Sequence, residues 1–396
     1  MSRPPLEVAD LIRAAGQTFI ERSCRWITRL HLKVLTAIER CRTAALGGHV
    51  DGCSRCGHRV ISYNSCRNRH CPKCQGNARE RWLADRRREL LPTMYVHIVF
   101  TLPHVLAPLA LQNKRVIYGL LFRTSAETLI EIARDPKHLG AEIGFFSVLH
   151  TWNQKLEHHP HVHCVVPAGG LSPDHSQWIK PRYAFFLPVH VLGRVFRGKF
   201  VAGLKQAYAA HHLGFHGQLQ FLAKPKAFAA WIRQLFRQDW VIYAKPPFGG
   251  AEHALHYLGN YTHRVAISNH RLVSLANGVV TFRWRDSAHH NKKRLMSLPL
   301  EEFLRRFLLH LLPPRFVRIR HFGFLANRKR SALLPLCFHV LGAPAFQSPA
   351  SLTPLADSCP PIGNCPLCGG IMILLQRFTA IDGIPRSPPS RNLEAR

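Results

Sequence analysis

Two groups of residues in this chain of 396 residues have types and spacings that suit phosphodiester chemistry. The first is the segment HPHVHCVVPAGG, in which His161 and His163 lie two positions apart. This segment is typical of a strand, and side chains alternate across a strand, so both imidazoles project from one face, about 6 to 7 Å apart. Two imidazoles on one face form a two-ligand site for a divalent metal ion, with coordination positions left open.

The second group is a pair of tyrosines, Tyr257 and Tyr261, in the segment HYLGNY. Their spacing of four places both hydroxyls on one face of a predicted helix, and the preceding segment KPPFGG sets where this helix begins. An aromatic stripe in the core is the alternative. It is disfavoured because polar residues lie near both rings, namely Asn260, His263 and Arg264, together with Gly259. A tyrosine oxygen can attack a DNA phosphodiester, leaving a phosphotyrosine on one DNA end and a free hydroxyl on the other.

A free tyrosine has a pKa near 10, so a nucleophilic tyrosine needs help from a metal ion or a nearby cation. Lys245 and Arg264 are the candidate cations. A bound Mg²⁺ or Mn²⁺ ion would polarise the scissile phosphate and neutralise its developing charge. Two imidazoles suit Mn²⁺ better than Mg²⁺, although the abundance of Mg²⁺ can decide which ion binds. The bond energy is conserved in the covalent link, so no nucleoside triphosphate is needed, and the sequence has no Walker-type glycine loop.

Cysteine spacing predicts a structural zinc site near the N-terminus. Cys53 and Cys56 form one C-x-x-C pair, and Cys71 and Cys74 form a second pair after fourteen intervening residues. Two such turns, each with two thiolates, can close a tetrahedron around a zinc ion. Other residues in the same loop can replace one ligand or contribute to a second site: Cys66, His58 and His70.

A third C-x-x-C pair, Cys365 and Cys368, is followed by two glycines and supplies half of another zinc site. Cys337 with His339, or Cys359, are the candidates to complete it, and unpaired thiols on a turn are the alternative. The N-terminus has no apolar core of the kind found in signal peptides, and no apolar run reaches the length of a membrane helix. We therefore expect a cytosolic chain whose 12 cysteines are metal ligands or core residues rather than disulfides.

The charge balance predicts a polyanionic partner. The formal net charge is +32, and nucleic acid is favoured over an anionic membrane surface because each phosphate met by Lys or Arg releases a counterion. Candidate DNA contacts are Arg67 and Arg69 in CRNRHCPKC, and Arg328, Lys329 and Arg330 in RIRHFGFLANRKR. In FRWR, Phe282 and Trp284 share one face of a strand, either as core residues or as platforms for stacked bases.

Hydrophobic periodicity predicts the elements that position these residues. Helices are expected within 1–50, 105–137, 186–212 and 226–238, and strands within 95–103, 143–152, 161–170 and 239–246. Asn277-Gly278 favours a hairpin with a type I′ turn. This order predicts an α+β protein with three regions: an N-terminal helical and zinc-binding domain (1–90), a catalytic domain (91–290), and a basic, mostly helical C-terminal region with a loose tail (291–396).

These segments resemble a known family. HPHVHCVVPAGG is similar to the histidine–hydrophobic–histidine (HUH) motif of rolling-circle endonucleases. YLGNYTHRVAISNHRL, preceded by YAKPPFGG, resembles the two-tyrosine helix of bacterial insertion-sequence transposases of the IS91 type. CRNRHCPKCQG resembles that family's zinc-binding domain, and RIRHFGFLANRKR and CPLCGG resemble its C-terminal region. The motifs occur in the family's order from about residue 10 to residue 375.

The resemblance implies an HUH-type antiparallel sheet flanked by helices, with the histidines on a central strand. It implies a DNA transposase that nicks and joins single-stranded transposon ends and target DNA through a 5′-phosphotyrosine, by a rolling-circle route. His161 and His163 match the family's metal ligands, and Tyr257 and Tyr261 match its nucleophiles. A third metal ligand is not assigned among the nearby Glu252, His256 and Asn260. The implied location is the bacterial cytoplasm, in association with the nucleoid and not with a membrane.

Two alternatives remain at this stage. A plasmid relaxase or replication initiator would use the same chemistry, but relaxases usually carry the nucleophile ahead of the histidines, and this chain has no tyrosine before Tyr63. A zinc-dependent DNA-binding regulator without catalysis would explain the charge and the cysteines. It would leave the histidine and tyrosine pairs to chance.

Overall fold

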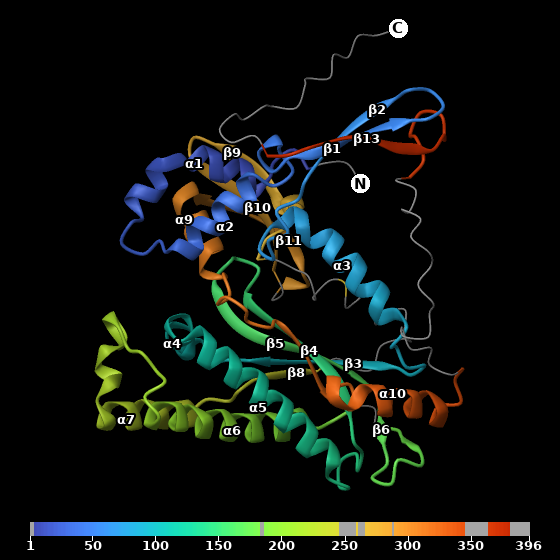
Figure 1. The fold of residues 1–396 in the computed structure, drawn as a ribbon. Helices are drawn as coiled ribbons and strands as arrows, with labels where there is room; N and C mark the ends of the chain where they lie inside the picture. The colour runs from blue at the N-terminus through green and yellow to red at the C-terminus, as the bar shows by residue number, and fades with distance from the viewer. Residues whose placement is uncertain are drawn as a thin grey trace. The chain divides into compact units, whose positions relative to one another are not determined.

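The computed structural model describes residues 4–182, 186–244, 259, 266–286, 289–344 and 363–380. The chain divides into two compact units, and most of their helices and strands are labelled in Figure 1. Unit 1 consists of Met1–Ala78, Ile267–Leu308 and Ser348–Arg396, and unit 2 consists of Arg79–Ala266 and Leu309–Gln347. The chain thus leaves unit 1 and returns to it twice. This division differs from the three consecutive regions expected from the sequence, because segments far apart in the chain pair in the same sheets.

Unit 1 combines helices with two small antiparallel sheets. Its helices are α1 (Val8–Arg22), α2 (Arg29–Glu39) and α9 (Leu300–Leu309, whose last residue falls in unit 2), with short 3-10 turns at Ala44–Leu46 and Asn269–Arg271. One sheet has the order β13-β1-β2, from Met372–Phe378, Gly48–Cys53 and Arg59–Tyr63. The other has the order β11-β10-β9, from Lys292–Pro299, Val279–Asp286 and Leu272–Ala276. Helix α3 (Pro72–Arg87) begins in unit 1 and continues in unit 2.

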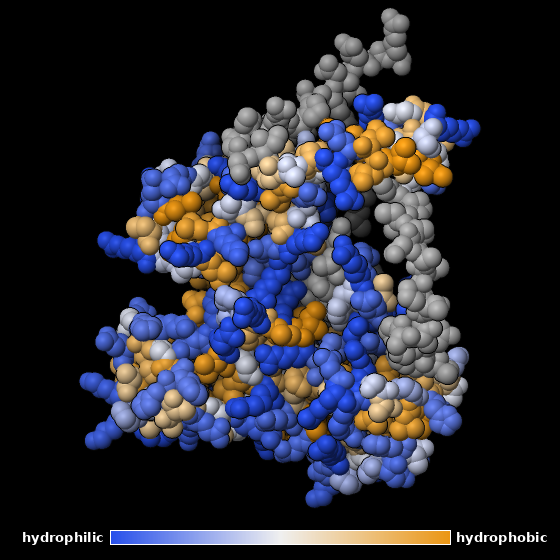
Figure 2. All heavy atoms as spheres, in the orientation of Figure 1, coloured by the Kyte–Doolittle hydropathy of each residue, from blue (hydrophilic) through white to orange (hydrophobic). Residues whose placement is uncertain are grey.

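The sheet β13-β1-β2 joins the two ends of the chain. Strand β13 pairs antiparallel with β1, with Gly48 opposite Phe378 and Cys53 opposite Met372. Most side chains of β13 are exposed, and Figure 2 shows hydrophobic side chains gathered over this sheet. The hydrophobic effect alone therefore contributes little to holding β13 in place.

The hairpin at Asn277-Gly278 is confirmed, since both residues have positive φ angles, 48° and 71°, as a type I′ turn requires. Phe282 on the second strand is fully buried and packs edge-on against Phe303 of α9, with ring centroids 5.7 Å apart. Phe282 is thus a core residue, which rules out the stacking of a base on this ring.

Unit 2 is built on a five-stranded antiparallel sheet in the order β12-β4-β5-β3-β8. These strands are Ile319–Gly323, Gly144–Trp152, His158–Pro167, Tyr95–Thr101 and Ile242–Ala244. The helices are α4 (Ala107–Gln112), α5 (Lys114–Arg134), α6 (Val189–Ala209), α7 (Pro225–Phe236) and α10 (Asn327–Val340), with 3-10 turns at His104–Leu106 and Gly217–Ala223. A small pair, β6 (Gly170–Leu171) with β7 (Trp178–Ile179), completes the unit. The expected α+β class, with an antiparallel sheet flanked by helices, is confirmed.

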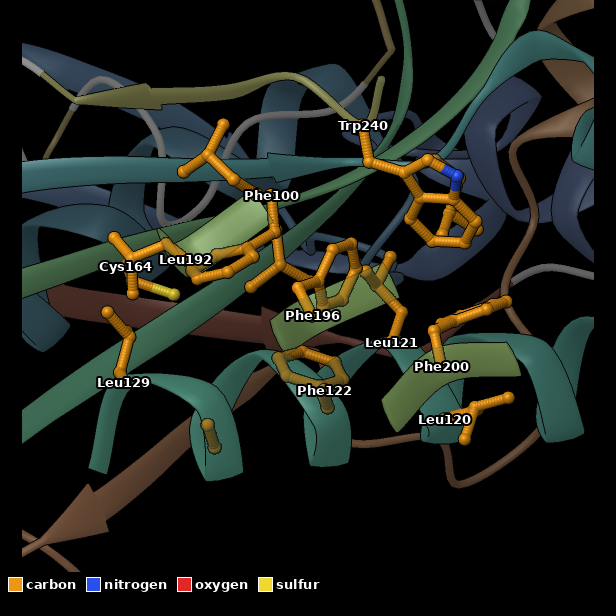
Figure 3. Packing of buried hydrophobic residues seen from close by; sticks show 14 of the residues in the cluster. Phe100, Leu120, Leu121, Phe122, Leu129, Cys164, Leu192, Phe196, Phe200 and Trp240 are labelled. Carbon is orange, nitrogen blue, oxygen red and sulfur yellow. The ribbon is translucent and has the colours of Figure 1, made fainter. Parts of the chain in front are cut away.

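Alternation along the strands separates the two faces of this sheet. Val162, Cys164 and Val166 of β5 face the main core, which also contains side chains of α5 and α6. Figure 3 shows the centre of this core, in which Phe196 packs against Phe100 and Trp240 with ring centroids 5.0 and 5.4 Å apart. The opposite face carries a smaller cluster and the histidines of β5. The large core on one face leaves the other face available for polar side chains.

The C-terminal region is less helical than expected. Residues Ile319–Gly323, from the basic segment RIRHFG, form an edge strand that pairs with β4. Phe322 stacks on Phe145 with ring centroids 5.3 Å apart, and Arg320 lies over the ring of Phe122. Basic residues alternate with apolar ones here, so the segment fits a sheet edge as well as it fits a helix, and only the partner strand decides between the two.

Candidate active site and metal centres

Three histidine rings gather on one face of the five-stranded sheet. His161 and His163 alternate along β5, the central strand, and His150 of β4 lies directly opposite His161. Residues opposite each other on paired antiparallel strands share a face, so the three imidazoles project together. Each ring offers one nitrogen, and these three nitrogens lie within 4.8 Å of one another. The arrangement has the size and the chemistry of a divalent metal site.

Hydrogen bonds set which ring nitrogen is available. Nδ1 of His161 lies 2.7 Å from the carbonyl oxygen of His159, so Nδ1–H donates and Nε2 keeps its lone pair. Burial lowers the pKa of His161 to about 4, which makes this ring neutral at pH 7. His97 of β3 stacks on His163 and joins it through Nε2 and Nδ1, which are 2.8 Å apart. Neutral rings held by a second hydrogen bond are prepared to bind a metal ion through the other nitrogen.

His150 is the member of this group that the sequence analysis missed. The candidates proposed for a third ligand were Glu252, His256 and Asn260, of which all three lie outside the described residues. His150 falls in the expected strand 143–152, and alternation places it on the same face as Phe146 and Val148. The sequence therefore predicts the strand and the face on which His150 lies. The register that sets His150 opposite His161 depends on tertiary pairing, which the sequence does not state.

The tyrosine pair lies outside the described residues, as do Lys245 and Arg264. Gly259, midway between the two tyrosines, is described, and it is helical and buried. A Cβ atom at Gly259 would lie 2.9 Å from Cδ1 of Leu83 in α3. Leu83 packs against the cluster of Tyr95, Phe146, Val148 and Val165. Gly259 therefore lies on the side of the sheet that carries the histidines.

The structure gathers eight cysteines of unit 1 into two clusters. The four Sγ atoms of the first cluster lie within 4.8 Å of one another, and they belong to Cys41, Cys66, Cys71 and Cys74. Sγ of Cys74 lies 3.5 Å from that of Cys41 and 3.6 Å from that of Cys66. A zinc tetrahedron with arms of about 2.3 Å has edges of about 3.8 Å, so these separations fit zinc. The backbone N–H of Cys66 donates to Sγ of Cys41, which favours the thiolate that zinc requires.

The second cluster consists of Cys53, Cys56, Cys365 and Cys368. Sγ of Cys53 lies 3.5 Å from Sγ of Cys368, and Sγ of Cys56 lies 3.7 Å from Sγ of Cys365. The backbone N–H groups of Cys56 and Arg55 donate to Sγ of Cys53 and lower the pKa of this thiol to about 6. The donor set is again four sulfur atoms at zinc-like separations.

The expectation that Cys53, Cys56, Cys71 and Cys74 share one ion is therefore wrong. The first pair lies at the end of β1, where β13 brings Cys365 and Cys368, whereas Cys71 and Cys74 lie at the start of α3 and meet Cys41. Cys41 escaped notice because it is not part of a C-x-x-C pair. Neither cluster includes the other proposed ligands His58, His70, Cys337 and His339, and Cys359 lies outside the described residues. Cys337 is instead buried in the core under α10.

Arg67, a predicted DNA contact, lines a polar pocket of unit 1 together with Arg42. The pocket has a volume of about 630 Å³, and its other lining residues are Ser62, Tyr63, Asn64 and Ser65. Arg42 and Arg67 each follow a cysteine of the first cluster, and both have left-handed backbones with φ of 59° and 51°. The cluster thus fixes two guanidinium groups at one polar pocket, an arrangement that suits phosphate contacts. Arg69 is half-buried, and burial lowers its pKa.

The three basic residues of the C-terminal region have different surroundings. Nζ of Lys329 lies 2.6 Å from Oε1 of Glu142, and Nη1 of Arg330 lies 3.2 Å from Oε1 of Glu89. Arg328 is exposed. The charges of Lys329 and Arg330 are thus already paired within unit 2, and these ion pairs connect α10 to the rest of this unit.

We expect Arg328→Ala to reduce the salt dependence of DNA binding by about one released counterion, since Arg328 is free to meet phosphate. Lys329→Ala and Arg330→Ala should instead lower the free energy of unfolding by about 1 kcal/mol each, because each leaves a half-buried carboxylate with fewer partners. Binding titrations at several salt concentrations and urea denaturation would separate the two effects. An unchanged salt slope for Arg328→Ala, with a reduced slope for Lys329→Ala, would contradict this division.

Comparisons with known proteins identify the class. A family model described as "Putative transposase" matches residues 144–332, which include the histidine strand, and a model described as "Transposase zinc-binding domain" matches residues 11–102. The protein is therefore a transposase with a zinc-binding domain. It belongs to the IS91 family of insertion-sequence transposases. A protein of Sinorhizobium fredii named "Putative transposase y4qJ" is 50% identical over 394 residues, covering 98% of this chain and 99% of the relative.

A second relative, the "Transposase for insertion sequence element IS801" of Pseudomonas savastanoi pv. phaseolicola, is 28% identical over 381 residues, covering 92% of this chain and 88% of the relative. No solved structure matches the chain significantly. Family membership favours the transposase over the relaxase and the regulator, and it makes DNA the partner of this enzyme. Among the described helices, none has the length and apolar character needed to cross a membrane.

Proposed function

We propose that this transposase nicks and joins single-stranded DNA through a 5′-phosphotyrosine intermediate, and that it moves its element by a rolling-circle route. Tyr257 and Tyr261 are the proposed nucleophiles. The observation that carries the proposal is the group of three imidazoles, His150, His161 and His163, with ligand nitrogens within 4.8 Å on one sheet face. A structural role does not require three rings to converge in this way.

The histidines would hold a divalent ion, Mg²⁺ or Mn²⁺, which when bound polarises the scissile phosphate and neutralises its developing charge. The chain's own contribution is to fix the ligands in advance. His97 orients His163, and the carbonyl of His159 orients His161, so neither ring has to reorient when DNA arrives. Because burial keeps His161 neutral, no proton has to leave this ring before it acts as a ligand.

In the proposed reaction a phenol oxygen forms a bond to phosphorus, and the bond between phosphorus and the 3′ oxygen breaks. The phenol loses a proton and the departing 3′ oxygen gains one, which leaves a 5′-phosphotyrosine and a free 3′ hydroxyl. Attack by a 3′ hydroxyl on this link reverses the exchange and joins two DNA ends. Two tyrosines allow two transfers in sequence, with one end held while the second is attacked.

The position of Gly259 supports the assignment of the tyrosines. This residue lies two positions from Tyr257 and two positions from Tyr261, and it lies against Leu83 on the histidine side of the sheet. The net charge of +32 and the paired guanidinium groups of Arg42 and Arg67 suit a substrate that is a DNA strand. A transposase that acts on bacterial DNA is expected in the cytoplasm, in association with the nucleoid.

The test is the capture of the covalent adduct. Single-stranded oligonucleotides that carry the element's ends are incubated with the full chain and Mn²⁺, with the label at either the 3′ or the 5′ end. We expect the 3′ label to stay on the protein and the 5′ label to leave with a free 3′ hydroxyl. The adduct should disappear in the double variant Tyr257→Phe/Tyr261→Phe, and mass spectrometry should find the DNA on one of these two residues.

The matched control is Tyr243→Phe on β8, since Tyr243 is exposed and belongs to neither motif. This variant should form the adduct as the wild type does. An adduct that persists in the double variant, or one that retains the 5′ label, would overturn the proposed chemistry. Annealing the complementary strand should suppress the adduct, and equal reaction with duplex DNA would contradict single-strand specificity.

A further inference from the structure

We propose that Cys53, Cys56, Cys365 and Cys368 bind a second zinc ion, which fastens the C-terminal segment 363–380 to strand β1. The zinc-binding family match ends at residue 102 and contains all four cysteines of the first cluster. The second cluster takes half of its ligands from a segment beyond both matched regions. Only half of this site thus lies within the matched domain, and the site is independent of the proposed nucleophiles.

The geometry of the four sulfur atoms supports a metal site rather than disulfides. The separations of 3.5 Å between Cys53 and Cys368 and 3.7 Å between Cys56 and Cys365 fit the edges of about 3.8 Å of a zinc–thiolate tetrahedron. A disulfide needs sulfur atoms at about 2.05 Å. Backbone N–H groups also donate to sulfur atoms of both C-x-x-C turns. Sγ of Cys53 accepts from Arg55 and Cys56, and Sγ of Cys368 accepts from Gly370. Such donors stabilise the negative charge of thiolates.

The two glycines after Cys368 allow the C-terminal cysteine turn to approach the turn of Cys53 and Cys56 closely. A Cβ atom at Gly370 would lie 3.0 Å from Sγ of Cys53 and 2.8 Å from Cβ of Arg55, so a larger residue would push the two turns apart. Gly369 has a φ of 72°, a conformation that glycine adopts readily. The C-x-x-C-G-G pattern is therefore explained by what the C-terminal turn meets across the cluster.

Strand β13 pairs with β1 along its length but buries little apolar surface. Ile373, Leu374 and Leu375 are 47%, 39% and 48% exposed, and Figure 2 shows hydrophobic side chains at this surface. The buried residue of the strand, Met372, packs against Cys53 and Cys365, which are ligands themselves. Ordering the segment costs conformational entropy that an exposed strand recovers poorly. A metal ion that binds only the assembled cluster would supply the missing stabilisation. Its binding free energy adds to the free energy of folding, because the site does not exist in the unfolded chain.

The first measurement is the zinc content of the full chain, purified without chelators, by plasma mass spectrometry. We expect two zinc ions per wild-type chain and one in Cys365→Ser/Cys368→Ser. Cys24→Ser is the matched control, because Cys24 is exposed and belongs to neither cluster. It should retain two ions. A wild type with one ion, or a double variant with two, would overturn the proposal.

The second measurement is hydrogen exchange of the amides of 372–378, which pair with β1. In the double serine variant these amides should exchange at least about 100-fold faster than in the wild type, while those of α2 stay protected. Loss of one zinc without faster exchange would show that the ion does not fasten the segment. If the double variant fails to fold, Cys368→His decides the question, since histidine can replace one thiolate. Two zinc ions in this variant are expected, and one would overturn the site.

Discussion

His161→Ala or His163→Ala should lower metal-dependent cleavage of single-stranded DNA by about 10³-fold or more. Each substitution removes one ligand from a set of three, and a divalent ion at a scissile phosphate contributes several kcal/mol of transition-state stabilisation. Cleavage is measured under single-turnover conditions with Mn²⁺ in excess, and Mn²⁺ affinity is measured by isothermal titration calorimetry. The adduct and the Mn²⁺ affinity should fall together.

His150→Ala tests the third ligand, and we expect a similar direction of change with a loss of cleavage of at least about 100-fold. His97→Phe keeps an aromatic ring that can stack on His163, but it removes the Nε2 atom that is hydrogen-bonded to Nδ1 of His163. A partner that orients a ligand in this way contributes about 10- to 100-fold in metal affinity or activity. The expected order is therefore a large loss for the ligands and a smaller loss for His97.

His190→Ala is the matched control, since His190 is exposed on α6, away from the histidine face. It should cleave as the wild type does. Circular dichroism and zinc content should be unchanged in all five variants, which separates loss of the ion from loss of the fold. Full activity of His161→Ala or His163→Ala in a folded, zinc-loaded chain would exclude the histidines from the reaction. Full activity of His150→Ala alone would leave the third ligand among Glu252, His256 and Asn260.

The second large effect is acid unfolding of unit 2 between about pH 6 and pH 4. Burial lowers the pKa of both His158 and His310 to about 3, from an ordinary value of 6.5. His158 accepts or donates at the Tyr118 hydroxyl, with Nε2 and Oη 2.8 Å apart. His310 donates Nε2–H to the Leu156 carbonyl, and its Nδ1 lies 3.2 Å from Oγ1 of Thr151.

The direction of the effect follows from proton binding. The folded-state pKa lies below the unfolded value, so the unfolded chain binds more protons between about pH 6.5 and pH 3. The free energy of unfolding is therefore unaffected above pH 7 and falls as the pH falls through this range. A pKa change from 6.5 to about 3 corresponds to roughly 5 kcal/mol per histidine below both values. Even one such group is comparable to the lower end of the stability of a typical domain, about 5 to 15 kcal/mol.

The measurement is the pH midpoint of hydrogen-exchange protection in α5, compared between the wild type and His158→Gln/His310→Gln. Glutamine keeps an amide donor and acceptor but does not titrate in this range. We expect the midpoint of the double variant to lie about half a pH unit or more below that of the wild type. The zinc sites titrate alike in both proteins, so the difference reports the two histidines. Coincident midpoints would show that these rings do not govern acid stability.

Much of the architecture was readable from local patterns. The strand 161–170 was predicted from its valines and alternating histidines, and the Asn277-Gly278 turn from the two residues that tolerate positive φ. In both cases the information lies within a few neighbouring positions, so periodicity and turn preference suffice. The same holds for the C-x-x-C pairs, since each pair sits on a single turn.

The pairing of segments that are far apart in the chain could not be predicted from local patterns. The basic segment RIRHFG became an edge strand because β4 offers it a free edge, and nothing within the segment names that partner. Cys41 and His150 joined metal-type clusters although neither belongs to a local motif. Lys329 and Arg330, predicted to contact DNA, found carboxylates inside unit 2.

The amino-acid sequence by itself therefore determined the chemistry that this transposase carries: paired imidazoles, paired phenols, thiolate turns and a large positive charge. The tertiary structure decided the grouping, giving three histidines instead of two, and two clusters of four cysteines instead of one. The physical reason is that side-chain type and strand or turn geometry are local properties. Cross-strand register and the meeting of chain ends depend on long-range pairing, whose free energy is shared by the whole fold.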